Sequence, residues 1–222
     1  VTMKISFSNI ISQIADNANS FNSTEVLNSI GLDKRIGNAY LKVGSAFSGP
    51  CFPRDNIAFI NYLKKSNINF GLQNSTVKIN LEQTSRYIRI LNNFKNIYKK
   101  NPKVGILGIS YKSDSDLFID SQSCEFVNFL LSKKYSVYYY DEYCNSNLVK
   151  NYFKKISHAK NIESLIKLTD IIFVFYKDKK ISKKINKMNT KKIIVDIWDQ
   201  LDLKENHFFL GKNNILHLKK TK

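Results

Sequence analysis

The sequence predicts an α/β protein, with an all-helical central domain that contains a long spine helix, followed by a Rossmann-like parallel α/β domain. Two observations support this prediction. Apolar residues recur at helical spacing up to residue 102, whereas short continuous apolar runs follow it. Those runs alternate with helical stretches, as in a parallel sheet covered on both faces. We therefore expect a helical domain at residues 1–102 and a sheet domain at residues 103–222.

Three helices are expected before the spine helix. The pair Asn22 and Glu25 resembles a capping box and opens a short helix that stops at Gly31. A loop at 44–50 leads into a further helix at 52–65. The helix that opens the chain is expected to bury one face, formed by Ile5, Ile10, Ile11, Ile14 and Ala18.

The spine helix is expected at residues 72–100. At 1.5 Å per residue it would exceed about 40 Å, and Pro102 limits its end. We expect its apolar stripe to form a dimer contact, and packing inside one subunit is the alternative. The stripe consists of Val77, Leu81, Thr84, Ile88, Leu91 and Tyr98.

Continuous apolar runs predict the strands of the second domain. They lie at 104–109, 137–140, 171–175 and 193–197, with a last candidate at 215–218 and a helix at 121–134. Ligands of such sheets bind beyond the carboxyl ends of the strands. Gly108 and Lys112 there can hold a phosphate, although no G-x-G-x-x-G fingerprint follows any predicted strand. Asp141 stands where a ribose-binding acid would lie, and fold topology alone explains these residues equally well.

Composition excludes several classes of protein. Apolar residues make up 43% and aromatic residues 13% of the chain, so we expect a packed core rather than disorder. We expect neither a membrane span nor a signal peptide, because no apolar run is long enough. The three cysteines and three histidines lack metal-ligand spacing, so we expect no metal site and a cytoplasmic protein.

The net charge of +17 suits a nucleic acid, an anionic membrane or small anionic ligands as partners. The densest basic stretch lies at residues 177–192, where eight lysines accompany Asp178. A compositional bias toward lysine, asparagine and isoleucine explains this stretch as well. Charge alone therefore leaves the kind of partner open.

The segment most suggestive of chemistry runs Gly49-Pro-Cys-Phe-Pro-Arg-Asp55. Cys51 lies at the start of a predicted helix, where free N–H groups and the cation of Arg54 favour a thiolate. Asp55 follows one helical turn later, on roughly the same face. A thiol beside a carboxylate suits covalent chemistry on an aldehyde or acyl carbon, with the carboxylate positioning water. From spacing alone, a half-buried cysteine that ends a loop is the simpler interpretation.

Three motifs in this order resemble those of the UDP-glucose/GDP-mannose dehydrogenase family, whose patterns are roughly GLDxRIG, GGSCFPKD and VAVLGLAFKxxTDDxRES. Here they read Asp33-Lys-Arg-Ile-Gly37, Gly49-Pro-Cys-Phe-Pro-Arg-Asp55 and Val104-Gly-Ile-Leu-Gly-Ile-Ser-Tyr-Lys112. The resemblance covers nearly the whole chain and implies the two domains expected above, the second of which binds the nucleotide. It also implies oxidation of a sugar 6-hydroxymethyl group to a carboxylate with two NAD, through a cysteine thiohemiacetal and thioester, for polysaccharide biosynthesis.

Residue by residue, the resemblance implies a catalytic pair and a set of substrate contacts. Cys51 matches the nucleophile and Asp55 the carboxylate that assists the water step. Arg54 stands where the family usually has a lysine, which keeps the charge but changes the donor geometry. Arg35 matches an arginine that reaches into the site of a neighbouring subunit, so a homodimer is implied. The other matches to substrate contacts are Tyr40, Lys42, Phe47, Tyr111 and Lys112.

The chain also departs from the family pattern. The N-terminal NAD-binding domain is absent, so we expect NAD to be bound mainly by that domain. Ser48 replaces a glycine, Ile119 replaces an arginine that contacts the cofactor, and Trp198-Asp199 replace a Gly-Arg segment that contributes a substrate-binding arginine. Because the chain opens on Val1 rather than Met, we expect a fragment of a complete enzyme that is inactive by itself.

Three interpretations result. The first is part of an NAD-dependent 6-dehydrogenase for a UDP-sugar, acting as a homodimer, with neither a nucleic acid nor a membrane as partner. The second is a non-catalytic module for nucleotide-sugar binding or dimerisation, which the lost arginines favour and the retained Cys51 and Asp55 oppose. The third is a basic nucleic-acid-binding protein, which rests only on net charge and the lysine-rich stretch at residues 177–192.

Overall fold

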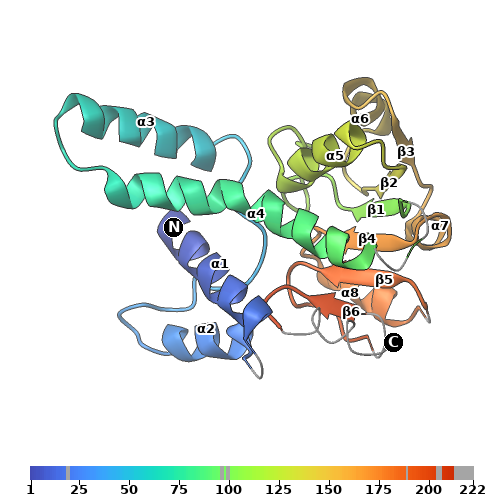
Figure 1. Ribbon diagram of the computed structural model, residues 1–222, viewed down its shortest axis with the longest axis horizontal. Helices are drawn as coiled ribbons and strands as arrows, with labels where there is room; N and C mark the ends of the chain where they lie inside the picture. The colour runs from blue at the N-terminus through green and yellow to red at the C-terminus, as the bar shows by residue number, and fades with distance from the viewer. Residues whose placement is uncertain (19–20, 96–97, 99–100, 189, 204–206, 213–222) are drawn as a thin grey trace.

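A helical part and a parallel sheet make up the molecule (Figure 1). The computed structural model describes residues 1–18, 21–95, 98, 101–188, 190–203 and 207–212. The long helix α4 runs from the other helices across to the sheet. The helical part contains α1 (Thr2–Asn17), α2 (Ser23–Gly31), α3 (Phe52–Lys65) and α4 (Gly71–Lys95).

Within the described residues, the sheet has six parallel strands in the order β3-β2-β1-β4-β5-β6. This is the doubly wound order of a Rossmann fold, so the expected fold class is confirmed. The strands are β1 (Val104–Leu107), β2 (Val137–Tyr140), β3 (Ile156–His158), β4 (Ile171–Val174), β5 (Ile193–Asp196) and β6 (His207–Phe209). The helices between them are α5 (Gln122–Ser132), α6 (Ser146–Tyr152), α7 (Ile162–Leu168) and α8 (Lys179–Asn186).

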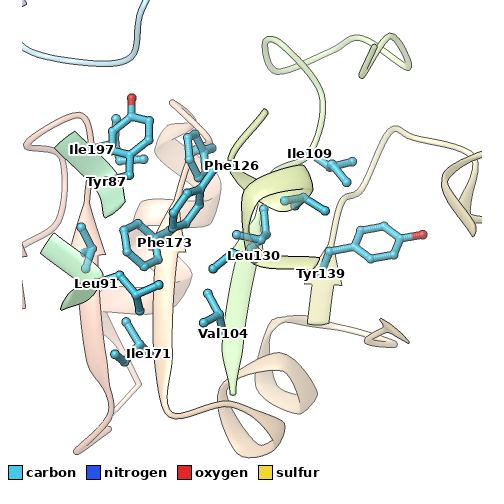
Figure 2. Close-up of a cluster of buried hydrophobic side chains, with 14 of the residues drawn as sticks. Tyr87, Leu91, Val104, Ile109, Phe126, Leu130, Tyr139, Ile171, Phe173 and Ile197 are labelled. Carbon is cyan, nitrogen blue, oxygen red and sulfur yellow. The ribbon is translucent and has the colours of Figure 1, made fainter. Parts of the chain in front are cut away.

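Apolar side chains cover both faces of this sheet. On one face, Tyr87 and Leu91 of α4 lie with Phe126 of α5 against Phe173 of β4 (Figure 2). The Tyr87 and Phe126 rings meet edge to face at a centroid distance of 5.8 Å. On the other face, α7 packs on β1 and β2, and apolar side chains of α7 and α8 share a buried cluster with β1, β4 and β5. Burial on both faces explains why the strands appear in the sequence as continuous apolar runs.

The helical part shares one apolar core with the sheet. Leu27 of α2, together with Leu41 and Val43, belongs to the same buried cluster as the strands. The helical part therefore packs directly on the sheet region. The expected domain boundary between residues 102 and 103 stays a prediction.

The expected buried face of α1 is wrong. Ile10 and Ile14 are 39% and 48% exposed, whereas Ser6, Asn9 and Ser12 are buried. Small side chains let α1 approach α4 closely, and hydrogen bonds replace apolar packing between the two helices. The Ser6 hydroxyl, for example, donates to the Thr76 carbonyl at 2.9 Å.

The expected stripe of α4 is buried only toward its end, where Leu91 lies in the core and Ile88 and Tyr98 pack against it. Leu81 is 62% exposed, while the buried face carries Thr76, Asn80, Gln83 and Arg86 before it becomes apolar at Tyr87. The Arg86 Nε donates to the Asp16 Oδ2 at 2.6 Å, which pairs the buried cation. The described part of the helix, Gly71–Lys95, is about 38 Å long by the usual rise.

Two strands of the sheet, β3 and β6, were missing from the sequence-based expectations. Each has three residues, which is too short for an apolar run to stand out. The strand expected at 215–218 and the helical residues expected at 96, 97, 99 and 100 lie outside the described residues.

Candidate functional site

A cavity of about 430 Å³, here called cavity A, lies where the helical part meets the carboxyl ends of the strands. It takes residues from α1, from the loop between α2 and α3, from the start of α3 and from the segments that follow β1, β4 and β5. Five of the expected substrate contacts line it. The lining consists of Ile5, Tyr40, Lys42, Ser45, Ala46, Phe47, Ser48, Phe52, Tyr111, Lys112, Lys177 and Trp198.

The charge of cavity A is positive. Lys42, Lys112 and Lys177 line it and no acidic residue does. Within the described ranges, no carboxylate forms an ion pair with any of these three lysines. The pKa of Lys177 is lowered, first by desolvation and then by the charge of Lys42. Three cations without a carboxylate ion pair favour an anionic ligand.

Aromatic rings form most of the remaining wall. Phe47 and Phe52 meet edge to face, with ring centroids 6.5 Å apart. Tyr40 adopts a φ of 61°, which is uncommon for a residue with a Cβ. Gly49 has a φ of 83°, and a Cβ there would lie 2.6 Å from the Tyr111 ring. Glycine is therefore required where the loop passes Tyr111.

The polar face of α4 holds the loop that carries Phe47. The Asn80 side chain accepts a hydrogen bond from the Phe47 N–H at 2.7 Å and donates one to the Phe47 carbonyl at 2.8 Å. The Gln83 Nε2 donates to the Gly44 carbonyl at 3.2 Å. Sequence reasoning missed both residues, because it looked for apolar periodicity on α4. Polar residues at helical spacing were the available signal.

Trp198 forms the boundary between cavity A and a second space of about 480 Å³, here called cavity B. Its indole Nε1 donates to the Phe175 carbonyl at 2.8 Å, and its backbone N–H donates to the Asp196 Oδ1 at 3.0 Å. A Cβ at Gly44 would lie 2.1 Å from the ring, so the ring packs directly on the loop backbone.

Cys51, Arg54 and Asp55 lie together at the start of α3, beside Phe52. Cys51 is exposed at the N-cap position of the helix. The Arg54 guanidinium pairs with Asp55 at 2.9 Å. The hydrogen bond to Asp55, the Asp55 charge and then the Cys51 charge raise the pKa of Arg54. None of these three residues lines cavity A, although Phe52 does.

Arg35 lies apart from both cavities. Its guanidinium forms a two-point pair with the Asp33 carboxylate, from Nε to Oδ1 at 3.0 Å and from Nη2 to Oδ2 at 2.6 Å. The side chain is 88% exposed. Hydrogen bonds from the Arg35 side chain and then its backbone lower the pKa of Asp33. Arg35 is therefore presented to solvent rather than to the site of its own chain.

The end of β1 does not form a dinucleotide cradle. The Asp141 carboxylate accepts the backbone N–H groups of Ile109, Ser110, Tyr143 and Cys144, so it holds two turns instead of a ribose. A Cβ at Gly108 would meet the Tyr176 ring at 2.8 Å, which shows that Tyr176 fills this place. The described residues therefore do not fit NAD at this sheet edge.

The described residues contain neither a group of metal-ligating side chains nor a membrane-spanning helix. No group of three or more His, Cys, Asp or Glu side chains there could hold a metal ion. No described helix is long and apolar enough to cross a membrane.

Comparison with protein families explains the two-part architecture. The profile of the UDP-glucose/GDP-mannose dehydrogenase family, central domain, matches residues 1–82, and that of the family's UDP binding domain matches residues 105–203. The chain belongs to this family. Tyr40, Lys42 and Phe47 come from the family's central domain, and Tyr111, Lys112, Lys177 and Trp198 come from its UDP binding domain. Cavity A thus lies at the junction of the two family domains.

Individual relatives support the same assignment. The chain is 27% identical over 172 residues to UDP-glucose 6-dehydrogenase of Rickettsia felis and covers 38% of that protein. It is 30% identical over 171 residues to UDP-glucose 6-dehydrogenase AglM of Haloferax volcanii and covers 39% of that protein. These matches include 77% of the chain. The chain therefore spans about two fifths of the length of these curated relatives.

Solved structures share the fold. A UDP-glucose dehydrogenase from Pyrobaculum islandicum superposes with a TM-score of 0.80 at 22% identity, over 95% of this chain and 48% of that one. A UDP-D-ManNAc dehydrogenase from Pyrococcus horikoshii superposes with a TM-score of 0.76 at 18% identity, over 96% of this chain and 49% of that one. At these identities the likeness shows the fold alone.

Proposed function

We propose that the chain is the central and UDP-binding part of an NAD-dependent nucleotide-sugar 6-dehydrogenase, which oxidises the C6 hydroxyl of a UDP-sugar to a carboxylate for polysaccharide biosynthesis. Cavity A is the observation that carries the proposal. Its three lysines match the phosphates of a nucleotide sugar, and its aromatic rings match the base and the sugar faces. Its position between two domains is typical of ligand sites.

In this proposal, five cavity residues bind the substrate. Lys42 and Lys112 neutralise the phosphates, while Tyr40, Phe47 and Tyr111 pack against the rest of the ligand. The Lys112 ammonium lies 5.4 Å from the centre of the Tyr111 ring, which places a cation and a ring side by side. The sugar end extends past Phe52 toward Cys51, because Cys51 precedes Phe52 at the start of α3.

Cys51 and Asp55 carry the covalent chemistry in this proposal. The first oxidation would turn the C6 alcohol into an aldehyde, with NAD as hydride acceptor, and the Cys51 thiolate would add to the aldehyde carbon. A second oxidation of this adduct, again with NAD as acceptor, would give a thioester, from which a water molecule displaces the thiolate. Asp55 accepts the proton of that water, and Arg54 keeps the carboxylate in place through their ion pair at 2.9 Å. The hydride acceptor is NAD, which we assign to a further part of the longer parent protein.

The proposal also includes a substrate, an oligomeric state and a cellular compartment. The substrate is a UDP-sugar, and the assembly is a homodimer in which Arg35 reaches the neighbouring subunit. All three cysteines are free, which suits the reducing conditions of the cytoplasm.

Ligand binding tests the proposal directly. UDP-glucose at 100 times its Kd should stabilise the chain by about 2.7 kcal/mol, which is readily seen as a rise in Tm. Lys112→Met should reduce that rise, whereas Lys133→Met, which removes an exposed charge at the end of α5, should leave it unchanged. No shift with any UDP- or GDP-sugar at millimolar concentration would contradict the proposed site.

A non-catalytic nucleotide-sugar-binding module is the second candidate. The exposed position of Cys51, outside the lining of cavity A, favours it. NAD reduction by the full-length parent separates the two functions. Activity that is lost in Cys51→Ala supports the enzyme, and a parent that binds UDP-glucose without reducing NAD supports the module.

A further inference from the structure

Lys177 and Trp198 meet at the edge of the sheet where the candidate ligand binds. Lys177 follows β4 and Trp198 follows β5, and these are adjacent parallel strands, so their carboxyl ends lie side by side. The Lys177 ammonium lies 4.8 Å from the centre of the Trp198 ring. Together with Lys42, these two residues line both cavity A and cavity B. They therefore form the wall that the two cavities share.

Trp198 is a fixed platform for this lysine. Its indole N–H donates to the Phe175 carbonyl at 2.8 Å, and its ring packs against Gly44, where a Cβ would lie 2.1 Å away. A cation over the face of a tryptophan is attracted to it and keeps its charge available for another ligand. The ring thus orients Lys177 without neutralising it.

The carboxylates nearest to Lys177 and Trp198 in the chain are engaged elsewhere. The Asp178 Oδ1 accepts the N–H groups of Lys180 and Ile181 and caps α8. The Asp199 Oδ1 accepts from the Lys212 ammonium at 2.8 Å, and its Oδ2 accepts from the Thr24 hydroxyl at 2.7 Å. Lys177 is consequently held next to Lys42 with no carboxylate ion pair among the described residues.

We infer that Lys177 is a further substrate-binding residue, which Trp198 positions so that Lys177 and Lys42 together bind the diphosphate of the nucleotide sugar. The inference rests on the proposed function. Two like charges kept close together repel each other, and a diphosphate between them removes this repulsion.

Calorimetric titration of the whole chain with UDP, UDP-glucose and uridine tests this inference. Lys177→Met should raise the Kd of UDP and UDP-glucose about tenfold, or 1.4 kcal/mol, and leave that of uridine unchanged. Lys177→Arg keeps the cation and should retain most of the affinity. Lys180→Met removes the same charge from an exposed position of α8 outside both cavities, so it should match the wild type.

Variants at position 198 test the platform. Trp198→Phe keeps a ring face and should bind UDP better than Trp198→Leu, which offers none. Circular dichroism and Tm confirm that each variant is folded. If Lys177→Met binds UDP as tightly as Lys180→Met, the inference is overturned while the proposed function stands. If the wild-type chain binds none of the three compounds, both are overturned.

Discussion

The three cysteines differ in their exposure to solvent. Cys51 is exposed at the start of α3, whereas Cys124 and Cys144 are buried. Burial is the main cause that raises the pKa of Cys124 to about 11. Burial and then the Asp141 charge also raise the pKa of Cys144, whose thiol donates to the Asp116 carbonyl at 3.3 Å. The exposed Cys51 thiol should therefore react faster with an alkylating reagent than the two buried thiols.

Iodoacetamide should label Cys51 before both other cysteines at pH 7, because only thiolates react and buried thiols stay protonated. Cys124 should gain reactivity only as the pH approaches 11. Arg54→Met should slow the labelling of Cys51, since the cation beside it is lost, and Lys65→Met at the exposed end of α3 is the matched control. Mass spectrometry of partly labelled protein reports all three sites. Earlier labelling of Cys124 or Cys144 would contradict the assignment of Cys51 as nucleophile.

The buried polar face of α4 determines the shape of the ligand loop. Asn80 satisfies both backbone groups of Phe47, which is itself buried. The Asn80 side chain of α4 thus makes the two backbone hydrogen bonds that a neighbouring strand would make in a sheet. Since a buried backbone group without a hydrogen bond is costly, this single side chain couples the stability of the loop to that of the helix.

Asn80→Ala should lower the free energy of unfolding by about 1–3 kcal/mol, because two buried backbone groups of Phe47 lose their partner. The same variant should weaken UDP-glucose binding, because Phe47 lines cavity A. Asn93→Ala, at an exposed position on the same helix, should change neither quantity. Urea unfolding and calorimetric titration measure the two effects. A variant with wild-type stability would show that the loop is held by other contacts.

At the scale of the whole molecule, apolar side chains on the helical part are exposed to solvent. Met3, Phe7, Ile10 and Ile14 form one stripe along α1, and Leu81 of α4 is 62% exposed. Large exposed apolar surfaces of this kind mark interaction sites. They support the proposed homodimer.

Light scattering should therefore give twice the 25.7 kDa mass of one chain at micromolar concentration. Leu81→Lys should shift the equilibrium toward the monomer, because it places a charge in the apolar contact. Leu148→Lys on α6, where the side chain is 59% exposed, should leave the dimer intact. A wild-type chain that stays monomeric at every accessible concentration would contradict the dimer.

Local sequence signals determined much of the fold. The apolar runs at β1, β2, β4 and β5 were predicted within two residues, and α3 was predicted from Phe52 to Lys65 as observed. Strand burial and helix capping depend on neighbouring residues, so they can be read along the chain. The resemblance to the family, rather than any local signal, indicated Tyr40, Lys42, Phe47, Tyr111 and Lys112, which the structure shows to line one cavity.

Only the tertiary structure decided which helix faces are buried and which further residues join the site. α1 and α4 meet through Ser6, Ser12, Thr76 and Arg86, because hydrogen bonds and small side chains can fill an interface that apolar periodicity does not predict. Asn80 reaches Phe47 across 33 positions of sequence. Lys177 and Trp198 become neighbours because β4 and β5 pair in parallel, which brings the ends of distant segments to one edge of the sheet.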